Sequence, residues 1–250
     1  MRHLDLFSGV GGFALAARWM GWETIQFVEI DKFCQEVLNK NFPNVPIHGD
    51  IKTFDGSKYR GAVDILTGGF PCQKFSLSGK GSADLTEWKE MFRVIGEIQP
   101  TVVLVENVYG LLVRKFGMAF ETVCADLETS GYEIQSFIIP ACAIDAPHKR
   151  ERIWICAYSE IFGRERLLCD FIKTSEIKGE RNSKERAPLG SRCNPFLQFE
   201  QSVGEPPIFG VDDGLPNRVD RLGSVGNSIH PQVAFEIFKA IELSFLPRDI

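Results

Sequence analysis

The sequence has few of the features from which structural metal sites and disulfide frameworks are built. Its seven cysteines include no C-x-x-C pair, and its four histidines lie far apart in the chain. This usage is typical of a reducing compartment, so we expect a cytoplasmic protein without structural zinc. No apolar run approaches the roughly 18 residues of a membrane helix, and the N-terminus lacks the apolar region of a signal peptide. These absences predict a protein with no metal and no membrane partner.

An excess of positive charge is also lacking, because the net charge of the chain is −5. An acidic protein binds nucleic acid poorly by charge alone, since non-specific affinity comes from neutralising phosphates. Residues 146–194 are the exception, with 11 Lys and Arg against 7 Asp and Glu. Such a segment is either a solvated loop or a local contact surface for nucleic acid, and charge leaves both interpretations open.

Strand-like and helix-like patterns alternate along the first 160 residues. We predict strands at residues 3–7, 24–30, 63–67, 101–105, 133–139 and 152–158, and helices at 13–20, 31–39, 87–98, 116–129 and 233–243. Alternation with buried, β-branched strands predicts an α/β fold with a doubly wound, mostly parallel sheet. Residues 160–217 break the pattern with many charges and five prolines. We therefore predict one main domain from residues 1–159 and 218–250, and a small irregular subdomain from 160–217.

A glycine-rich turn and two acidic residues predict a site for an adenosine-containing cofactor. Gly9, Gly11 and Gly12 lie between the first strand and its helix, where glycine lets a ligand approach the backbone. Glu29 ends the second strand about 20 residues later, where an acid binds ribose hydroxyls. Asp50 follows the third strand position and is placed to reach an adenine amino group. The spacing is G-x-G-G rather than G-x-G-x-x-G, which makes a dinucleotide the weaker alternative.

Four further residues predict nucleophilic chemistry at the same edge of the sheet. Cys72 follows Pro71 in a loop after the fourth strand, and an exposed loop favours a reactive thiolate over a buried thiol. Glu106 ends the fifth strand, where burial would raise its pKa and make it a proton donor. Arg150 and Arg152 alternate at the start of the last strand, so both should project to one face and hold a carbonyl, a phosphate or the Glu106 carboxylate.

These motifs together resemble the S-adenosylmethionine-dependent DNA (cytosine-5)-methyltransferase family. The matching blocks occur in family order: Asp5-Leu-Phe-Ser-Gly-Val-Gly-Gly-Phe13, Pro71-Cys-Gln-Lys-Phe-Ser76, Glu106-Asn-Val108, Arg150-Glu-Arg152 and Gly226-Asn-Ser228. The resemblance implies a Rossmann-like methyltransferase fold, in which residues 160–217 form a reduced target-recognition region. It also implies methylation of cytosine C5 in double-stranded DNA, through a covalent bond from Cys72 to C6 and flipping of the base out of the duplex.

The resemblance assigns a role to each site residue. Cys72 resembles the nucleophile, Glu106 the acid at cytosine N3, and Arg152 the contact to O2, while Arg150 holds the loop. The implied cofactor residues are Phe7, which stacks on adenine, Gly9, Gly11, Gly12, Glu29, Ile30, Asp50, Ile51, Pro71, Asn227 and Ser228. Some relatives have Trp at the position of Ile30, so adenine packing is weaker here.

Three alternatives to this function are weighed. The same chemistry could act on RNA, because some relatives in this family methylate tRNA. A nucleotide-binding oxidoreductase would need G-x-G-x-x-G and gives Cys72 and Glu106 no role. A non-catalytic, cofactor-sensing DNA-binding module is disfavoured because every catalytic position is filled. We therefore expect a monomeric enzyme whose partner is double-stranded DNA, of the kind found in restriction-modification systems.

Overall fold

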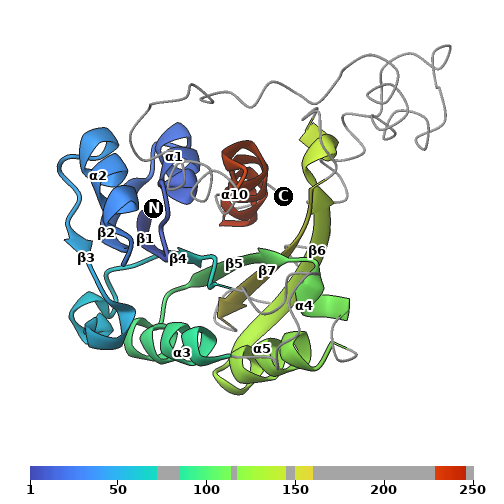
Figure 1. The fold of residues 1–250 in the computed structure, drawn as a ribbon. Helices are drawn as coiled ribbons and strands as arrows, with labels where there is room; N and C mark the ends of the chain where they lie inside the picture. Colours follow the sequence, from blue (N-terminus) through green and yellow to red (C-terminus); the bar gives the residue numbers. More distant parts are fainter. Residues whose placement is uncertain (72–84, 114–116, 145–149, 160–228, 246–250) are drawn as a thin grey trace, which may run out of the picture.

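A seven-stranded sheet with helices on both faces organises the protein (Figure 1). The structure is a computed structural model, and it describes residues 1–71, 85–113, 117–144, 150–159 and 229–245. The strands are β1 (Arg2–Leu6), β2 (Glu23–Val28), β3 (Ile47–His48), β4 (Ile65–Gly68), β5 (Val102–Val108), β6 (Tyr132–Pro140) and β7 (Glu151–Ser159). The α-helices are α1 (Gly12–Trp19), α2 (Lys32–Asn41), α3 (Thr86–Ile98), α4 (Gly110–Val113), α5 (Met118–Thr129) and α10 (Pro231–Phe245). Short 3-10 turns are η1 (Ile51–Thr53), η2 (Gly56–Tyr59) and η4 (Ala141–Ile144).

The strand order is β3-β2-β1-β4-β5-β7-β6. The neighbours from β3 to β5 pair in parallel, whereas β7 runs antiparallel to both β5 and β6. This confirms the predicted doubly wound, mostly parallel sheet. The prediction did not include α4, and it extended the second strand to Ile30, whereas β2 ends at Val28. Beyond Val28 the Glu29 N–H still donates to the His48 carbonyl, and the Glu29 carboxylate accepts from backbone amides of the neighbouring turns.

Two apolar layers enclose the sheet. Val103 and Val105 of β5 pack with α3 and α5 on one face, and Val102 and Leu104 pack with α1 and α10 on the other. This alternation follows from the period of two in a strand, and it explains why β5 is apolar on both faces. Figure 1 shows α1, α2 and α10 on one side of the sheet and α3 and α5 on the other.

Helix α10 packs against the sheet from the far end of the sequence. The Phe238 ring centroid lies 4.7 Å from that of Trp22, and Trp22 Nε1 donates to Glu242 Oε1 at 2.9 Å. Helix α10 thus shares a hydrophobic core with α1 and the sheet. None of the helices in the described ranges is long and apolar enough to cross a membrane.

The direction of the crossovers changes between β1 and β4, which are neighbouring strands of the sheet. The chain leaves β1 towards α1 on one face, and the helix after β4 is α3 on the other. In open α/β sheets, ligands bind where neighbouring strands lead to opposite faces. The residues that follow β1 and β4, at 7–12 and 69–71, are therefore the natural walls of a site.

Candidate active site at the carboxyl edge of the sheet

The glycine turn after β1 contains one residue that faces open space. Gly9 has a φ of +53°, and a Cβ built there would meet no atom of the described residues within 4 Å. A Cβ on Gly11 would lie 2.9 Å from Leu38 Cδ2, and one on Gly12 would lie 2.6 Å from Ile229 Cγ1. The predicted roles of these glycines therefore differ: Gly9 leaves room for a ligand, whereas Gly11 and Gly12 allow close packing of the turn.

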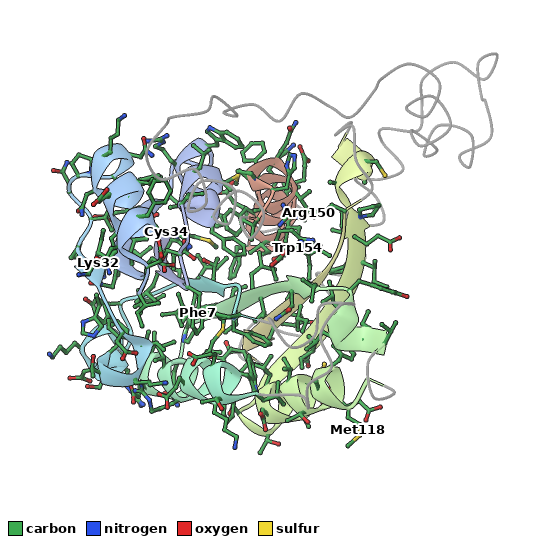
Figure 2. The ribbon with its side chains drawn as sticks, viewed as in Figure 1. Phe7, Lys32, Cys34, Met118, Arg150 and Trp154 are labelled. Atoms are coloured by element: carbon green, nitrogen blue, oxygen red, sulfur yellow. The ribbon has the colours of Figure 1, made fainter. Side chains whose placement is uncertain are left out.

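Phe7 connects β1 to this turn in a strained conformation. Its φ of 52° is in the left-handed region, which an aromatic side chain adopts at a cost of about 1–3 kcal/mol. The side chain is half-buried against the α3 layer, and Figure 2 shows it beside the sheet. Such strain is typical of functional turns, so the geometry is consistent with the implied role of Phe7 at a cofactor.

Glu29 is buried directly beside the turn. Its Oε2 accepts from the Gly9 backbone N–H at 2.6 Å, and its Oε1 accepts from the Asp31 N–H at 2.8 Å. Burial raises the pKa of the carboxyl, while these two amide donors oppose the rise. The carboxylate is thus held in one orientation at the carboxyl end of β2, where the sequence predicts an acceptor for ribose hydroxyls.

Asp50, Ile51 and Ile30 surround the same end of β2 and β3. Asp50 caps η1, because its Oδ1 accepts from the Lys52 N–H at 2.9 Å. Ile51 is 5% exposed and belongs to the core, so its backbone rather than its side chain is available to a ligand. Ile30 is 70% exposed and provides an open apolar surface beside Glu29.

The other half of the edge holds a buried acid between two arginines. Glu106 is 6% exposed, and Arg152 Nε lies 2.9 Å from its Oε1. Oε1 nevertheless takes no well-aligned hydrogen bond from the described residues. Burial raises the pKa of Glu106 to about 7, although the charges of Arg152 and then Arg150 lower it. The carboxyl therefore keeps its proton to a higher pH than an ordinary glutamic acid, as a proton donor requires.

The reversed direction of β7 explains this meeting. Arg152 pairs with Val108 in the β5–β7 ladder, so the start of β7 reaches the carboxyl end of β5. Arg150 lies one residue before the strand, and the Arg152 and Glu106 charges act on its guanidinium. Figure 2 shows Arg150 and Trp154 on the α10 side of β7. The structure thus brings together Glu106, Arg150 and Arg152, as the alternation predicts.

The chain that leads to Cys72 passes beside Glu106. A Cβ on Gly69 would lie 3.4 Å from Glu106 Oε2, and Asn107 Nδ2 donates to the Phe70 carbonyl at 3.3 Å. Phe70 is buried with its ring centroid 5.5 Å from that of Trp88. Pro71 follows and is exposed. Cys72, Asn227 and Ser228 lie outside the described residues, as do residues 160–217, so these predictions stay untested.

A polar network inside β1 is a feature that the sequence reasoning missed. Thr67 Oγ1 donates to Asp5 Oδ1 at 2.7 Å and lies 2.7 Å from His3 Nε2, while His3 Nδ1 lies 2.9 Å from Thr24 Oγ1. Burial raises the pKa of Asp5 to about 8 and lowers that of His3 to about 3. Polar residues at alternate positions of a buried strand were the available signal.

Metal ligands are not gathered anywhere in the described ranges. No three His, Cys, Asp or Glu side chains lie close enough there to hold a metal ion. The acids of the candidate site, Glu29, Asp50 and Glu106, are each engaged with amides or arginines instead.

Comparison with known proteins decides the family. The C-5 cytosine-specific DNA methylase family matches residues 1–189. The chain belongs to this family. Among the relatives of this methylase, type II methyltransferase M.Eco47II of Escherichia coli is 40% identical over 161 residues, which cover 62% of the chain and 38% of the relative. Type II methyltransferase M.HhaI of Haemophilus parahaemolyticus is 38% identical over 162 residues, covering 63% and 49%. The methylase chain therefore spans about half the length, or less, of the curated relatives that it matches.

Solved structures support the fold of this methylase. A DNA modification methyltransferase encoded in an E. coli prophage aligns with a TM-score of 0.56 and 27% identity, over 64% of the chain and 47% of that protein. The S. pombe Dnmt2 methyltransferase aligns with a TM-score of 0.54 and 22% identity, over 74% and 57%. The second comparison shows the fold alone. The predicted Rossmann-like methyltransferase fold is confirmed.

Proposed function

We propose that this chain transfers a methyl group from S-adenosylmethionine to C5 of cytosine in double-stranded DNA. The observation that carries the proposal is the Glu106 carboxyl, which is 6% exposed, has a pKa near 7 and lies beside Arg152. Addition to the cytosine ring needs a protonated acid of this kind. The positive charges of the arginines lower the pKa of Glu106, so that the carboxyl can also release its proton. Membership of the family agrees with this chemistry.

The cofactor half is assigned to the ends of β1, β2 and β3. S-adenosylmethionine, when bound, supplies an electrophilic methyl group on a sulfonium. The residues present fit that group, because Gly9 faces open space and Glu29 presents a fixed carboxylate to ribose hydroxyls. Asp50 then accepts from the adenine amino group, and Phe7 and Ile30 contact the ring. Gly11, Gly12, Ile51, Pro71, Asn227 and Ser228 complete the proposed cofactor site.

The base half supplies the reactivity that cytosine lacks. The C5 atom is too electron-poor to attack a methyl group until a nucleophile adds at C6. We assign that addition to the Cys72 thiolate, whose sulfur forms a bond to C6 while Glu106 donates a proton to N3. C5 becomes an enamine carbon and takes the methyl group, and S-adenosylhomocysteine leaves. Water then removes the C5 proton, which breaks the bond to sulfur and restores the thiolate, and N3 returns its proton to Glu106. Arg152 holds O2, and Arg150 holds the loop.

DNA access follows from the same chemistry. A stacked cytosine exposes neither C6 nor N3 to a side chain, so the base must be flipped out of the duplex. We assign target recognition to residues 160–217, and phosphate contacts to the basic stretch 146–194. Several relatives are named type II methyltransferases, which supports a DNA-modifying enzyme. We propose that it acts as a monomer in the cytoplasm.

Labelled methyl transfer tests the proposal directly. The full chain is incubated with S-[methyl-³H]adenosylmethionine and either duplex DNA or tRNA, and 5-methylcytosine is identified after digestion. We expect label in duplex DNA and little in tRNA. Label in tRNA alone would establish the RNA alternative, and label in neither, with cofactor binding retained, would favour the non-catalytic module. Bisulfite sequencing of DNA from a methylation-deficient host that expresses the chain then identifies the target.

A further inference from the structure

Arg93 of α3 binds the backbone of the segment that follows β3. Its Nη2 donates to the Ile51 carbonyl at 2.7 Å, and its Nη1 donates to the Phe54 carbonyl at 3.1 Å. Ile51 is the first residue of η1, and Phe54 is the C-cap that follows its last residue. One planar guanidinium therefore spans the whole turn from the side of α3.

The guanidinium is itself fixed by two carboxylates of the same helix. Arg93 Nε lies 3.0 Å from Glu90 Oε2, and Nη1 lies 2.6 Å from Glu97 Oε1. The other Glu97 oxygen accepts from the Gly56 N–H at 2.8 Å, at the start of η2. The N–H groups of the planar Arg93 guanidinium thus bond to four acceptors at fixed angles. The single ammonium of lysine cannot reproduce this arrangement.

The position of the Asp50 carboxylate depends on this turn. Asp50 Oδ1 accepts from the Lys52 N–H at 2.9 Å, and the Asp50 carbonyl accepts from the Thr53 N–H at 3.0 Å. Both donors are residues of η1. Because Arg93 fixes the two ends of η1, a shift of the turn would move the carboxylate with it.

We propose that Arg93 is a positioning residue for adenine recognition. It holds the backbone of residues 51–54 on α3, so that the Asp50 carboxylate meets the exocyclic amino group of the cofactor. The inference rests on the proposed function, in which Asp50 is the adenine contact. It extends the site to a side chain two turns into a helix on the opposite face of the sheet from the glycine-turn helix α1.

The test compares two ligands that differ at the adenine amino group. Binding of S-adenosylhomocysteine and of S-inosylhomocysteine, in which a carbonyl oxygen replaces that group, is measured on the full chain by isothermal titration calorimetry. The wild-type chain should prefer the adenosine ligand by about tenfold or more, because a hydrogen bond to a charged acceptor is lost in the other. Arg93→Gln and Arg93→Lys should bring the ratio close to one, mainly by weakening the adenosine ligand.

Arg60 provides a matched control. Its guanidinium also ties this segment to α3, with donors to the Glu97 and Gly96 carbonyls at 2.9 and 3.1 Å, but beyond η2 rather than at η1. Arg60→Gln should lower the melting temperature as the Arg93 variants do, and should leave the ligand ratio unchanged. The double variant Arg93→Gln/Asp50→Asn should show the same ratio as Asp50→Asn alone, since Arg93 acts through Asp50.

Each outcome bears on one claim. A wild-type ratio in both Arg93 variants, with only a lower melting temperature, would overturn the positioning role and leave the proposed function intact. Failure of the wild-type chain to bind S-adenosylhomocysteine would instead overturn the proposed function. Tight binding of both ligands by the wild-type chain would reject Asp50 as the adenine contact, and with it the role of Arg93. If Arg93→Gln does not fold, Arg93→Lys decides the question.

Discussion

The two halves of the carboxyl edge are built in different ways. In the cofactor half, backbone amides orient the side chains: both oxygens of Glu29 accept N–H groups, and Asp50 caps η1. In the base half, the acid from β5 is balanced by arginines at the start of β7. The first arrangement is made by local turns, and the second by strand register and charge. The cofactor half should therefore tolerate changes of pH that alter the base half.

Loss of the proposed nucleophile should have the largest effect, because it should abolish methylation and leave cofactor binding unchanged. Cys72→Ser should reduce methylation by more than about 100-fold, because a hydroxyl is far less nucleophilic than a thiolate at neutral pH. The dissociation constant for S-adenosylhomocysteine should stay within about twofold of wild type, since the nucleophile does not hold the cofactor. Single-turnover methylation and calorimetry measure the two effects. Cys124→Ser, on α5, is the control and should change neither; substantial turnover by Cys72→Ser would remove Cys72 as the nucleophile.

Removal of the acid should affect rate and pH dependence together. Glu106→Gln keeps the size of the side chain but loses the proton, and should slow methylation by about 10²–10⁴-fold. The pKa of Glu106 is raised to about 7, so its protonated fraction falls as the pH rises through 7. The acid-dependent part of the wild-type rate should fall over that interval, and the variant should lack this limb.

A matched change distinguishes this effect from general damage. Glu121→Gln on α5 removes an acid outside the site and should leave the rate and its pH profile as in wild type. Retention of the wild-type pH limb in Glu106→Gln would assign the titration to another group. Equal loss of cofactor binding in Glu106→Gln would show that the two halves are not independent.

The cofactor half should be broken by Glu29→Gln. The NH2 group of the glutamine amide would face one of the N–H donors of Gly9 and Asp31, and the side chain would no longer offer a charged acceptor to the ribose hydroxyls. The dissociation constant for S-adenosylhomocysteine should therefore rise about tenfold. The rate at saturating cofactor should change little. Glu23→Gln, at the exposed start of β2, should leave the affinity unchanged. A lower saturated rate with unchanged affinity would place Glu29 in the base half instead.

The smallest expected effect is on the pH dependence of the unfolding free energy, through the buried residues Asp5 and His3 of β1. The folded pKa of Asp5, about 8, exceeds its ordinary 3.8. The native state thus binds the extra proton between these values, and the contribution of Asp5 to stability falls as the pH rises through them. His3 is lowered from 6.5 to about 3, so its contribution falls as the pH drops below 6.5. The two slopes oppose each other below 6.5, and only the loss from Asp5 continues up to 8.

Two variants resolve these contributions. Between about pH 6.5 and 8, the difference in unfolding free energy between Asp5→Asn and wild type should grow in favour of the variant, by up to about 1.4 kcal/mol per pH unit. His3→Asn should remove the opposite slope at lower pH. Urea titrations at a series of pH values measure both. A pH-independent difference for Asp5→Asn would mean that Asp5 keeps an ordinary pKa in the folded protein.

Local signals predicted most of the fold and brought two groups of the candidate site together. The second helix was predicted to begin at residue 31, and the Asp31 side chain accepts from the Cys34 N–H as the N-cap of α2. The meeting of Glu106 and Arg152 followed from alternation at two strand ends. Other features are hydrogen bonds between residues far apart in the sequence. They link Glu29 to Gly9, Arg93 to the backbone of η1, and Thr67 to Asp5. Their partners are set by the packing of elements, which no pattern within a single segment specifies.

The reversed strand β7 also constrains any attempt to replace residues 160–228, which include the proposed target-recognition region. Ser159, at the end of β7, bonds to Thr101 before β5, whereas Ile229 packs on Gly12 at the opposite edge of the sheet. Along the strand direction, Ser159 and Ile229 are thus separated by about the length of β5, roughly 20 Å for seven residues at about 3.3 Å each. A graft with adjacent ends cannot be joined directly. Replacement modules need widely spaced termini or a spacer of at least about six extended residues at one junction.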